Sequence, residues 1–380
     1  MISNNKTDIK IGLPVSMTGQ FSVQGQQIYQ GIDMWMSDFN QREELLSSHE
    51  DRYYPSLLVY DDHSNVKTLT KVMSKMINED KVDIMLGPYS TGLIKTAAKI
   101  CRANKKVLWN HSGASKAMHD EGNRYLVSIL SSCHTYLSGL ANLTMTNQLD
   151  PLVVASIHCE AGEFSREVTK SGIESYNKCP SVICHEKTFH PSLIDFQAII
   201  KDLIHLNPDV IIFIGRIHHD IEFCRQIYDS PIRSKIICVG AAGISQFRET
   251  LQYKSDYVVG PSQWEYSGHS SNSNVFDSLI SEQDNIKNLN FFEDIDYPVI
   301  QAYVTGLIIE ECVRNVNELS QDKLRKFVAD LDINTLLGRF KIDDSGLQIG
   351  HKPLLVQWRH GHKVVVSNRS DLMIRGDVIC

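Results

Sequence analysis

Several motifs that carry chemistry are missing from this sequence. It has nine cysteines but no Cys-x-x-Cys pair, and this absence excludes the usual zinc and thiol-redox motifs. It also lacks a Gly-x-Ser-x-Gly elbow, a Gly-x-Gly-x-x-Gly loop and a Walker lysine motif, so the common nucleophile and phosphate-binding signatures are absent. An enzyme needs a nucleophile beside a base, a metal cluster or paired carboxylates. We therefore predict a non-catalytic protein with no catalytic residue, no metal and no cofactor.

The residues most similar to a metal-binding motif are histidines. His218 and His219 precede Asp220, but no third ligand follows at helical spacing, as a stable site would require. We interpret the pair as the start of a helix on the surface. His360 and His362 flank Gly361 and are expected to be exposed at a hairpin turn.

Long apolar runs and an excess of positive charge are also absent. No stretch approaches the roughly 18 uninterrupted apolar residues of a membrane span. The net charge of −7 argues against a nucleic-acid partner. The first residues lack the apolar core of a signal peptide. Two locations therefore stay open: periplasmic or otherwise extracytoplasmic with the leader removed, or cytoplasmic as a sensor.

The cysteines are scattered and odd in number. Cys224, Cys238 and Cys312 fall in apolar patterns and are expected in the core. Cys179 and Cys184 flank a short turn, so they are either free or joined in a disulfide in an oxidising compartment.

Two stretches, Asp83–Gly92 and Val107–Ser115, share an unusual form. Each is an apolar run of strand length that ends in small, hydroxyl-bearing residues. Ligands of parallel α/β sheets bind outside the carboxyl ends of the strands, where helix N-termini offer unpaired N–H donors. Hydroxyls and glycines at both ends suit a small anion such as a carboxylate; these residues are Ser90, Thr91, Ser112 and Ser115 with Gly87, Gly92 and Gly113. The alternative is that the hydroxyls only cap helices.

Strand and helix patterns alternate along most of the chain. Strands are predicted at residues 9–15, 57–62, 83–87, 107–110, 151–157, 182–187, 210–215, 235–240 and 257–260. Helices are predicted between these strands. One of them covers residues 136–145, and another is capped by Asp62 or Ser64. Two late helices, 297–316 and 320–330, precede extended segments at 338–343, 353–358 and 363–366. This order is typical of doubly wound, mostly parallel sheets.

The β-α series restarts near Leu130, so two lobes of similar α/β architecture are expected. The first is predicted to hold residues 1–130 and 261–337, and the second residues 131–260 and 338–380. Facing strand ends would form a cleft, which is a common place for a small-ligand site.

From about Ile9 to Asn368 the chain resembles type I periplasmic-binding-protein-like receptors, in the branched-chain amino acid and amide group of solute-binding proteins. The motifs that carry the resemblance occur in order over nearly the whole chain: Ile11–Gly19 with Gly25 and Gly31, Tyr60–Asp62, Gly87–Thr91, Ser112–Ser115, Asp195-Phe196, Pro208–Val210, Leu337–Phe340 and Gly350–Trp358. Gly260–Glu265 together with that last segment is similar to a subgroup whose members include receptors for aromatic and other organic acids.

The resemblance implies two Rossmann-like lobes joined by three crossovers, which close on a ligand by a hinge. It places the ligand carboxylate against Thr91, with Ser90 its neighbour, and against Gly113, Ala114 and Ser115. Phe164 matches an aromatic wall residue of the second lobe. Of the other aromatics, we place Tyr89, Trp264 and Tyr297 at the cleft, with ordinary core packing as the alternative.

One position departs from the pattern of the amino-acid receptors. They place a carboxylate after the strand at 236–240 to bind the substrate ammonium, and this chain has Ala241-Ala242-Gly243 there. An ordinary α-amino acid is therefore disfavoured unless Glu160, Glu163 or Glu265 takes that role. Arg216 either pairs with a second ligand carboxylate or forms an exposed salt bridge.

These observations predict a solute-binding protein that captures a small carboxylate-bearing ligand, either an amino acid, an amide or an aromatic or other organic acid. Its expected partners are that ligand and the membrane permease of an ABC importer. The alternative is the ligand-sensing domain of a signalling or regulatory protein of the same fold, which would act on a signalling partner.

Overall fold

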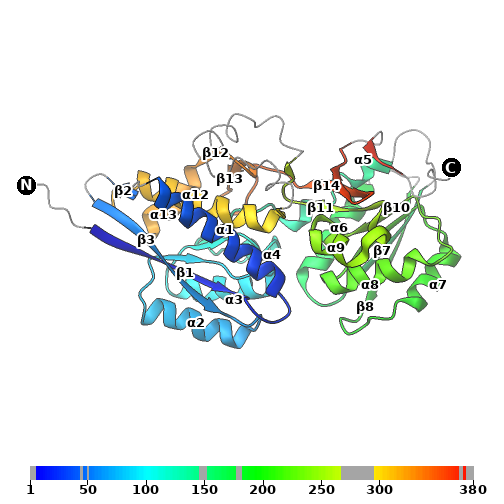
Figure 1. The fold of residues 1–380 in the computed structure, drawn as a ribbon, viewed down its shortest axis with the longest axis horizontal. Coiled ribbons are helices and arrows are strands. Elements are labelled where there is room, and N and C mark those ends of the chain that lie inside the picture. Colours follow the sequence, from blue (N-terminus) through cyan, green and yellow to red (C-terminus); the bar gives the residue numbers. More distant parts are fainter. Residues whose placement is uncertain are drawn as a thin grey trace, which may run out of the picture. The chain divides into compact units, whose positions relative to one another are not determined.

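The structure is a computed structural model, and it describes residues 6–42, 46–48, 51–144, 152–176, 182–266, 295–367 and 371–373. Its contacts divide the chain into two compact units (Figure 1). Unit 1 contains the described parts of Met1–Ser132 together with Tyr297–His351. Unit 2 contains those of Cys133–Ser271, Phe292–Asp296 and Lys352–Cys380.

Unit 1 is built on a six-stranded sheet with the order β2-β3-β1-β4-β5-β6. Every neighbouring pair is parallel except β2 with β3, which is antiparallel at the edge. The strands are β1 (Lys6–Val15), β2 (Leu46–Ser48), β3 (Asp51–Asp61), β4 (Ile84–Leu86), β5 (Leu108–Asn110) and β6 (Leu126–Ser128).

Helices cover both faces of this sheet (Figure 1). On one face, α2 (Val66–Asn78) and α3 (Thr91–Ala103) share an apolar core with Met85, Leu108 and Leu126. On the other, α1 (Ser22–Gln41) packs against α12 (Tyr297–Asn315). The remaining elements of unit 1 are α4 (Ala117–Asp120), α13 (Gln321–Asp330) and the hairpin of β12 (Asp332–Thr335) and β13 (Gly338–Lys341).

The contact of α1 with α12 explains two buried residues. A Cβ at Gly306 would lie 2.1 Å from Trp35 Cδ2, so only glycine lets the indole pack against α12. Trp35 Nε1 donates a hydrogen bond to Glu310 Oε1 at 2.6 Å, and Arg42 pairs with the same oxygen at 2.7 Å. The Glu310 carboxylate is therefore buried with its charge matched.

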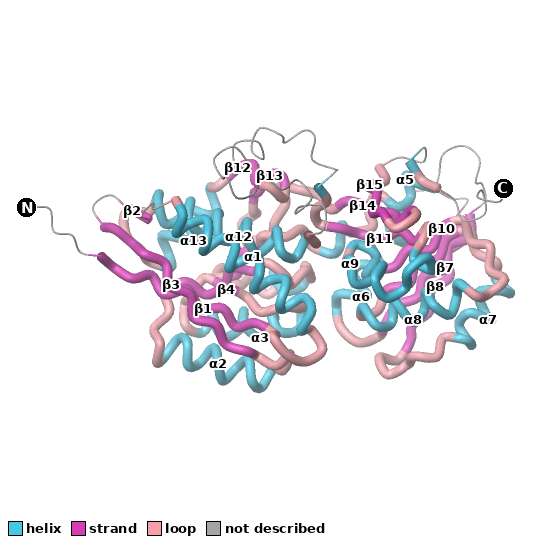
Figure 2. The backbone as a smooth tube through the Cα atoms, viewed as in Figure 1, coloured by secondary structure: helices cyan, strands magenta, loops and turns pink. Residues whose placement is uncertain are grey.

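Unit 2 is built on a seven-stranded sheet with the order β15-β14-β11-β10-β9-β7-β8. The strands from β8 to β11 are parallel, whereas β14 is antiparallel to both β11 and β15. Figure 2 shows the helices that surround this sheet. The strands are β7 (Leu152–Cys159), β8 (Val182–Phe189), β9 (Val210–Ile214), β10 (Ile236–Val239), β11 (Val258–Ser262), β14 (Leu354–Arg359) and β15 (His362–Val365). The helices are α5 (Leu140–Thr144), α6 (Glu163–Tyr176), α7 (Gln197–Leu206), α8 (Ile217–Tyr228) and α9 (Ser245–Leu251).

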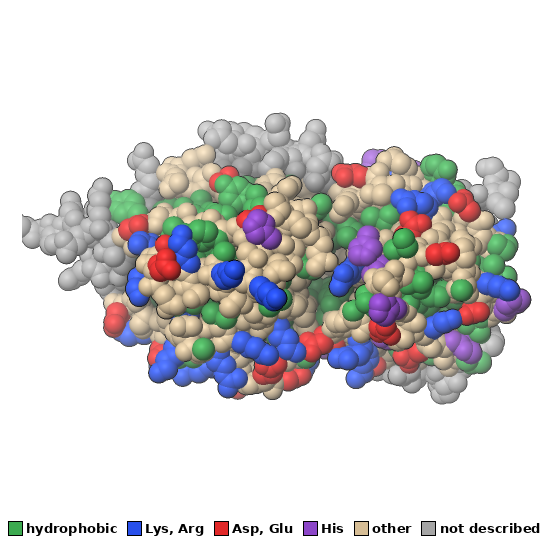
Figure 3. Space-filling model, turned by 90° about the horizontal axis from the view of Figure 1, so that it is seen from below, with side chains coloured by type: hydrophobic (Ala, Val, Ile, Leu, Met, Phe, Trp, Pro, Cys, Tyr) green, Lys and Arg blue, Asp and Glu red, His purple; other side chains and the backbone are tan. Residues whose placement is uncertain are grey.

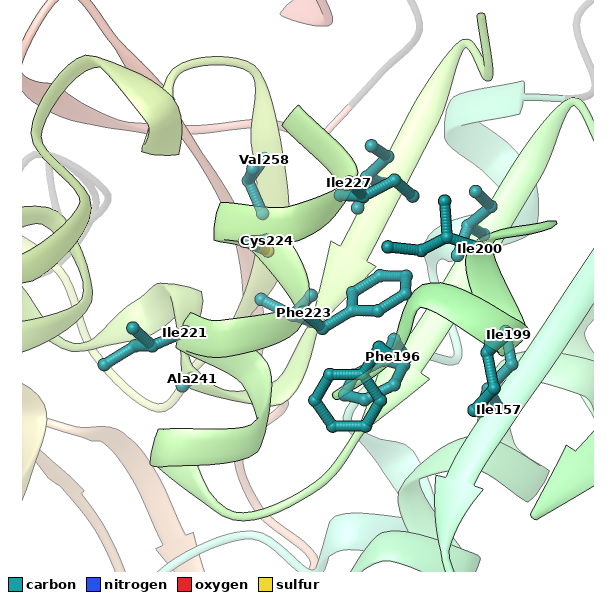
Figure 4. Close-up of a cluster of buried hydrophobic side chains, with 14 of the residues drawn as sticks. Ile157, Phe196, Ile199, Ile200, Ile221, Phe223, Cys224, Ile227, Ala241 and Val258 are labelled. Atoms are coloured by element: carbon teal, nitrogen blue, oxygen red, sulfur yellow. The ribbon is translucent and has the colours of Figure 1, made fainter. Parts of the chain in front are cut away.

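Aromatic rings form the centre of the unit 2 core (Figure 4). The Phe213 ring, on β9, is stacked on Phe223 with a centroid separation of 3.9 Å and on Phe189 at 5.0 Å. Phe196 meets Phe213 edge to face at 5.1 Å. Both stacked and edge-to-face contacts add stability beyond the burial of apolar area.

The predicted fold of two α/β lobes with parallel sheets is confirmed, but the unit boundaries differ from the expected ones. Among the described residues, the chain passes between the units after Ser132, Asp296 and His351. Residues 338–351 belong to unit 1 because Gly346 O accepts from Ser128 N at 2.9 Å and Asp344 O accepts from Arg325 at 2.9 Å. Residues 261–266 belong to unit 2, because β11 continues to Ser262 and pairs with β14.

Two local predictions were wrong in detail. Instead of a helix over 136–145, the structure has a 3₁₀ turn at Cys133–Thr135 and the short α5. The cap of α2 is Asn65, whose side chain accepts from the Lys67 and Thr68 N–H groups. Asp62 instead accepts from Ser16 Oγ at 2.6 Å and from Ser64 N at 2.7 Å.

The predicted hairpin turn at Gly361 is confirmed. His360 and Gly361 have φ angles of 48° and 92° between the antiparallel β14 and β15. Two positive φ angles in a two-residue turn match the right-handed twist of paired strands.

The sequence predicts that the chain has no membrane span and no nucleic-acid-binding surface. None of the described helices is both long and apolar enough to cross a membrane. On the face in Figure 3, basic and acidic side chains are interspersed.

The aromatic core of unit 2 yields a test of stability. Phe213→Ala should lower the free energy of unfolding by about 3–5 kcal/mol, because Phe213 is fully buried. The matched control is Ile183→Ala on β8, whose side chain is 54% exposed; it should cost about 0.5 kcal/mol or less. Urea unfolding measures both, and equal losses would contradict the assignment of the core.

Candidate functional site

The two turns that follow β4 and β5 lie side by side at the carboxyl edge of the unit 1 sheet. Gly87 N donates to Trp109 O at 2.9 Å. Ser112 Oγ donates to Pro88 O at 2.6 Å and so joins the second turn to the first. The structure therefore brings together the predicted residues of both turns, which are Tyr89, Ser90, Thr91, Gly113, Ala114 and Ser115.

Asn110, the last residue of β5, holds the second turn in place. Its Oδ1 accepts from Ser112 N at 3.1 Å and from Gly113 N at 2.7 Å. Its Nδ2 donates to Gly113 O at 2.7 Å and to Ser128 Oγ at 2.8 Å. All four hydrogen-bonding positions of the buried amide are used. Asn110 has no distinctive signal in the sequence, because a lone Asn at a strand end is common in ordinary turns.

A buried histidine extends this network. His119 Nδ1 lies 3.0 Å from Ser345 O, and its Nε2 lies 2.8 Å from Ser128 Oγ. A carbonyl only accepts, so Nδ1 carries the proton and Nε2 accepts from the Ser128 hydroxyl. That hydroxyl in turn accepts from Asn110. Burial lowers the pKa of His119 and favours this neutral form.

The first turn combines a helix cap with an unusual backbone. Ser90 Oγ accepts from Leu93 N at 3.4 Å, so Ser90 caps α3 as the capping alternative predicts. Its φ of 82° is rare for a residue with a side chain. Backbone strain of this kind concentrates at functional sites. Thr91 is half-buried, and its hydroxyl has no hydrogen-bond partner among the described residues.

Unpaired backbone donors gather at this edge. The N–H groups of Thr91, Gly92 and Ala114 have no acceptor within the described ranges. The first two open α3, so the positive end of the helix dipole adds to them. This arrangement is chemically suited to a small anion.

The glycines of the turns serve packing more than ligand access. A Cβ at Gly87 would lie 2.4 Å from Ile94 Cδ1, and one at Gly113 would lie 2.7 Å from Ile94 Cβ. Both turns therefore close on Ile94. Only Gly92 faces open space, with nothing within 4 Å of its Cβ position. The expectation that all three admit a ligand needs correction for Gly87 and Gly113.

His111, in the second turn, is buried without a hydrogen bond. Only 1% of the residue is exposed, and neither ring nitrogen has a partner among the described residues. Burial lowers the pKa of His111 to about 4, and the nearby backbone of Gly87 acts in the opposite direction. The imidazole is therefore neutral at pH 7. The sequence pattern contained no signal for it.

The aromatic residues predicted at this edge are half-buried. The Tyr89 ring meets Phe21 edge to face, with centroids 5.6 Å apart. Burial raises the pKa of Tyr89 to about 12, so its hydroxyl stays protonated. Tyr297 begins α12 in the same unit and is also half-buried.

At the carboxyl edge of unit 2, one carboxylate holds the strand ends together. Asp220 Oδ1 accepts from Gly215 N at 2.7 Å, and its Oδ2 accepts from Ala241 N at 2.8 Å. The group therefore links the end of β9 to the turn after β10. Burial raises the pKa of Asp220 to about 8, against the effect of these N–H donors.

The interpretation of His218 and His219 as a surface helix start was half wrong. His218 is exposed, but His219 is fully buried. His219 Nε2 lies 2.9 Å from Pro191 O, and Arg216 N donates to its Nδ1 at 3.2 Å. The ring is thus a neutral structural element, and burial lowers its pKa to about 4.

The other predicted residues of unit 2 lie in different environments. Ala242 and Trp264 are almost completely buried. Phe164, near the start of α6, is half-buried and meets Tyr136 edge to face at 6.0 Å. Arg216 is exposed at the N-cap of α8.

The described residues form no cluster suited to a metal ion, and the arrangement of Thr18, His63 and Asp61 does not form a catalytic relay. No group of three or more His, Cys, Asp or Glu residues is suited to hold a metal ion there. Thr18, His63 and Asp61 lie close together, but His63 Nδ1 faces both Thr18 Oγ1 at 2.6 Å and Asp61 Oδ2 at 3.1 Å. A nucleophile–base relay uses opposite ring nitrogens, so this cluster does not form one.

The disulfide alternative falls partly outside the described residues. Cys184 is half-buried on β8, whereas Cys179 is not described. Cys224, Cys238 and Cys312 are buried, as expected.

Comparisons with known proteins agree with this architecture. A model of the family described as "Periplasmic binding protein" matches residues 8–363. A leucine-binding protein from Thermotoga maritima has a TM-score of 0.80 at 15% identity, covering 96% of this chain and 100% of that one.

Two further structures were solved with ligands. The branched-chain amino acid binding protein of Streptococcus pneumoniae, in complex with isoleucine, has a TM-score of 0.78 at 16% identity, covering 95% of this chain and 99% of that one. A solute-binding protein of R. palustris, in complex with benzoate, has a TM-score of 0.74 at 15% identity, covering 94% and 95%. At these identities the likeness shows a shared fold.

The packing of Ile94 gives a test of the turns. Gly113→Ala should lower the free energy of unfolding by about 1–3 kcal/mol, because the new Cβ overpacks Ile94. Gly92→Ala is the matched control in open space, and it should raise stability by about 0.4–1 kcal/mol. Urea unfolding compares them. Equal effects would contradict the close packing of the second turn.

His111 predicts a pH dependence of stability. Its pKa is about 4 in the folded protein and about 6.5 in an unfolded chain. The unfolded chain therefore binds more protons between these values, so the free energy of unfolding should fall as the pH drops from 6.5 to 4. His111→Leu should flatten this slope by up to about 1.4 kcal/mol per pH unit. Urea unfolding at several pH values measures the slope, and an unchanged slope would refute the assignment.

Proposed function

The chain belongs to the periplasmic binding protein family, and on this basis we propose that it captures a small carboxylate-bearing solute and releases it unchanged. The observation that carries the proposal is the pair of joined turns in unit 1. They present unpaired N–H groups of Thr91, Gly92 and Ala114 beside the unpartnered Thr91 hydroxyl. A carboxylate supplies the acceptors that these donors lack.

We propose ligand-contacting residues for each unit by itself. In unit 1, the free donors of Thr91, Gly92 and Ala114 hold the carboxylate. Ser90, Gly113 and Ser115 shape the turns that present these donors, and Tyr89 and Tyr297 lie in the same unit. In unit 2 we propose Phe164 and Arg216 as the residues that contact a ligand, because Ala242 and Trp264 are almost completely buried. Half-buried rings such as Tyr89 and Phe164 suit this role, because they offer large apolar area at a small entropic cost.

Ligands of the structural neighbours support this solute class. Isoleucine and benzoate, which two of them bind, share a carboxylate and an apolar body. Two others were solved with p-hydroxybenzoic acid and 3,4-dihydroxybenzoic acid. We therefore propose amino acids, amides and aromatic or other organic acids as the range of candidates.

The transport role follows from the same relatives. Several neighbours are described as solute-binding proteins of ABC transporters, so we propose an ABC permease as the partner and an extracytoplasmic location. These relatives favour transport over the alternative of a sensor domain in a signalling protein.

A binding experiment tests the proposal. Calorimetric titration with a panel of amino acids, amides and benzoates should identify a ligand, and the same ligand should raise the melting temperature. No binding at millimolar concentration by any member of the panel would argue strongly against solute capture.

The contribution of Thr91 has its own prediction. Thr91→Val should weaken binding of the identified ligand about tenfold, because one hydrogen bond to a charged group is lost. Thr70→Val is the matched control, since Thr70 is exposed on α2 and bonds only to Val66 O. It should leave the affinity unchanged. Equal affinities for both variants would remove Thr91 from the site.

A further inference from the structure

Two helices of unit 1, α2 and α3, carry basic residues and no acidic ones. Their basic residues are Lys67, Lys71 and Lys75 on α2 and Lys95, Lys99 and Arg102 on α3. Every other described α-helix that has a lysine or arginine also has an acidic residue. The whole chain has a formal charge of −7, whereas its residues 66–106 include nine basic and only three acidic residues. Positive charge is therefore concentrated on these two helices.

The basic residues lie on the outer side of the helix pair. α2 and α3 pack against each other and share one apolar core, which leaves their opposite sides to solvent. Five of the six basic residues are exposed, and Lys95 is half-buried with its Nζ 3.8 Å from Glu121 Oε1. Lys67, Lys71 and Lys99 form no ion pair with any described residue. Figure 3 is seen from below and shows several basic side chains on the side of unit 1 where Figure 1 places α2. We call the surface of these six residues the α2–α3 face.

Helix stability does not explain this arrangement. Like charges four residues apart destabilise a helix. The two helices contain three such pairs, namely Lys67 with Lys71, Lys71 with Lys75, and Lys95 with Lys99. Lys67 also lies in the first turn of α2, where the helix dipole disfavours a cation. Solubility does not require these lysines, because the chain already has a net charge well away from zero and of the opposite sign. An anionic partner accounts for them.

The residue types on the α2–α3 face fit a lipid surface better than a protein partner. Protein–protein interfaces are enriched in arginine and aromatic residues and depleted in lysine. This face has five lysines and one arginine, and neither helix contains an aromatic residue. A cluster of roughly four to eight lysines or arginines is typical of a surface that binds anionic phospholipids. Among the large apolar side chains of the two helices only Val66 is exposed, so the face suits contact with headgroups and not insertion.

We propose that the α2–α3 face docks unit 1 on an anionic lipid bilayer through the phosphate groups of the lipids. Lysine ammonium groups are point charges on flexible stems, which suit headgroups that move in the plane of the bilayer. The contact is electrostatic, so it needs no membrane-spanning helix and is weakened by salt. The inference goes beyond the proposed function, because it concerns a surface outside the solute site.

Vesicle binding by the full chain tests the proposal. One set of vesicles contains phosphatidylglycerol and phosphatidylcholine in equal amounts, and the other contains phosphatidylcholine alone. At low ionic strength, sedimentation should show binding to the first set that is at least tenfold stronger than to the second, and added salt should release the protein. Equal binding to both sets, or binding to neither, would overturn the proposal. The proposed function would remain, since the titration of solutes involves no bilayer.

Two triple variants with the same change in net charge locate the binding surface. The first combines Lys67→Gln, Lys71→Gln and Lys99→Gln. It should bind the anionic vesicles about tenfold more weakly or worse, because each lysine near such a surface contributes about fivefold. The control replaces exposed lysines of α6, α7 and α13 and combines Lys170→Gln, Lys201→Gln and Lys326→Gln. It should bind nearly as the unchanged protein does, and equal losses in both variants would overturn the proposal.

The first variant should keep its fold, because glutamine is a good helix former and the substitutions remove two pairs of like charges on α2 and one on α3. Circular dichroism checks both variants. Labelled poly-glutamate, followed by fluorescence anisotropy, separates an acidic protein partner from a lipid surface. If the unchanged protein binds poly-glutamate and not the anionic vesicles, the α2–α3 face binds acidic protein segments and the assignment to a bilayer is wrong.

Discussion

Just beyond the carboxyl ends of the parallel strands, the backbone N–H and C=O groups no longer have hydrogen-bond partners in the sheet. In each unit, one buried side chain supplies hydrogen bonds to these groups. In unit 1, Asn110 bonds to Ser112 and to both backbone groups of Gly113. In unit 2, Asp220 accepts from Gly215 and Ala241. An unpaired buried amide costs about 1–3 kcal/mol, so these side chains decide the shape of the turns. The candidate site consists of the N–H groups of Thr91, Gly92 and Ala114, which these side chains do not bind.

The two edges therefore differ in what they offer. The turns of unit 1 retain N–H groups without acceptors, beside a strained Ser90, and suit an anion. The turn after β10 in unit 2 is fixed by buried side chains, because Ala241 N donates to Asp220, Ala242 O accepts from Trp358 and Gly243 O accepts from Lys363. Neither edge presents a free carboxylate that follows directly from a strand end within the described turns at 87–92, 111–115 and 240–243.

Much of the fold followed from the sequence, because buried parallel strands are short apolar runs with clear boundaries. β9 and β10 are entirely buried and were predicted within a residue or two. The joined turns of unit 1 were also predicted, from hydroxyls after two successive strands. Contacts between distant residues were not: Asn110 with Ser128, Ile94 with Gly113, and Lys363 with Glu265 leave no local pattern. For the same reason the last boundary was misplaced, since Gly346 bonds back to Ser128.

The packing of α1 against α12 has a consequence for how the protein is made. Trp35 and Glu310 are separated by 275 residues, so α1 leaves the ribosome long before the helix that it packs against. The parallel strands β7 to β11 of unit 2 lie within residues 152–262 and are complete well before α12 is synthesised. Unit 2 is also incomplete at that point, because β14 and β15, which extend its sheet beyond β11, follow α12 in the sequence. Both units therefore finish folding only after the segments from α12 onward have been made.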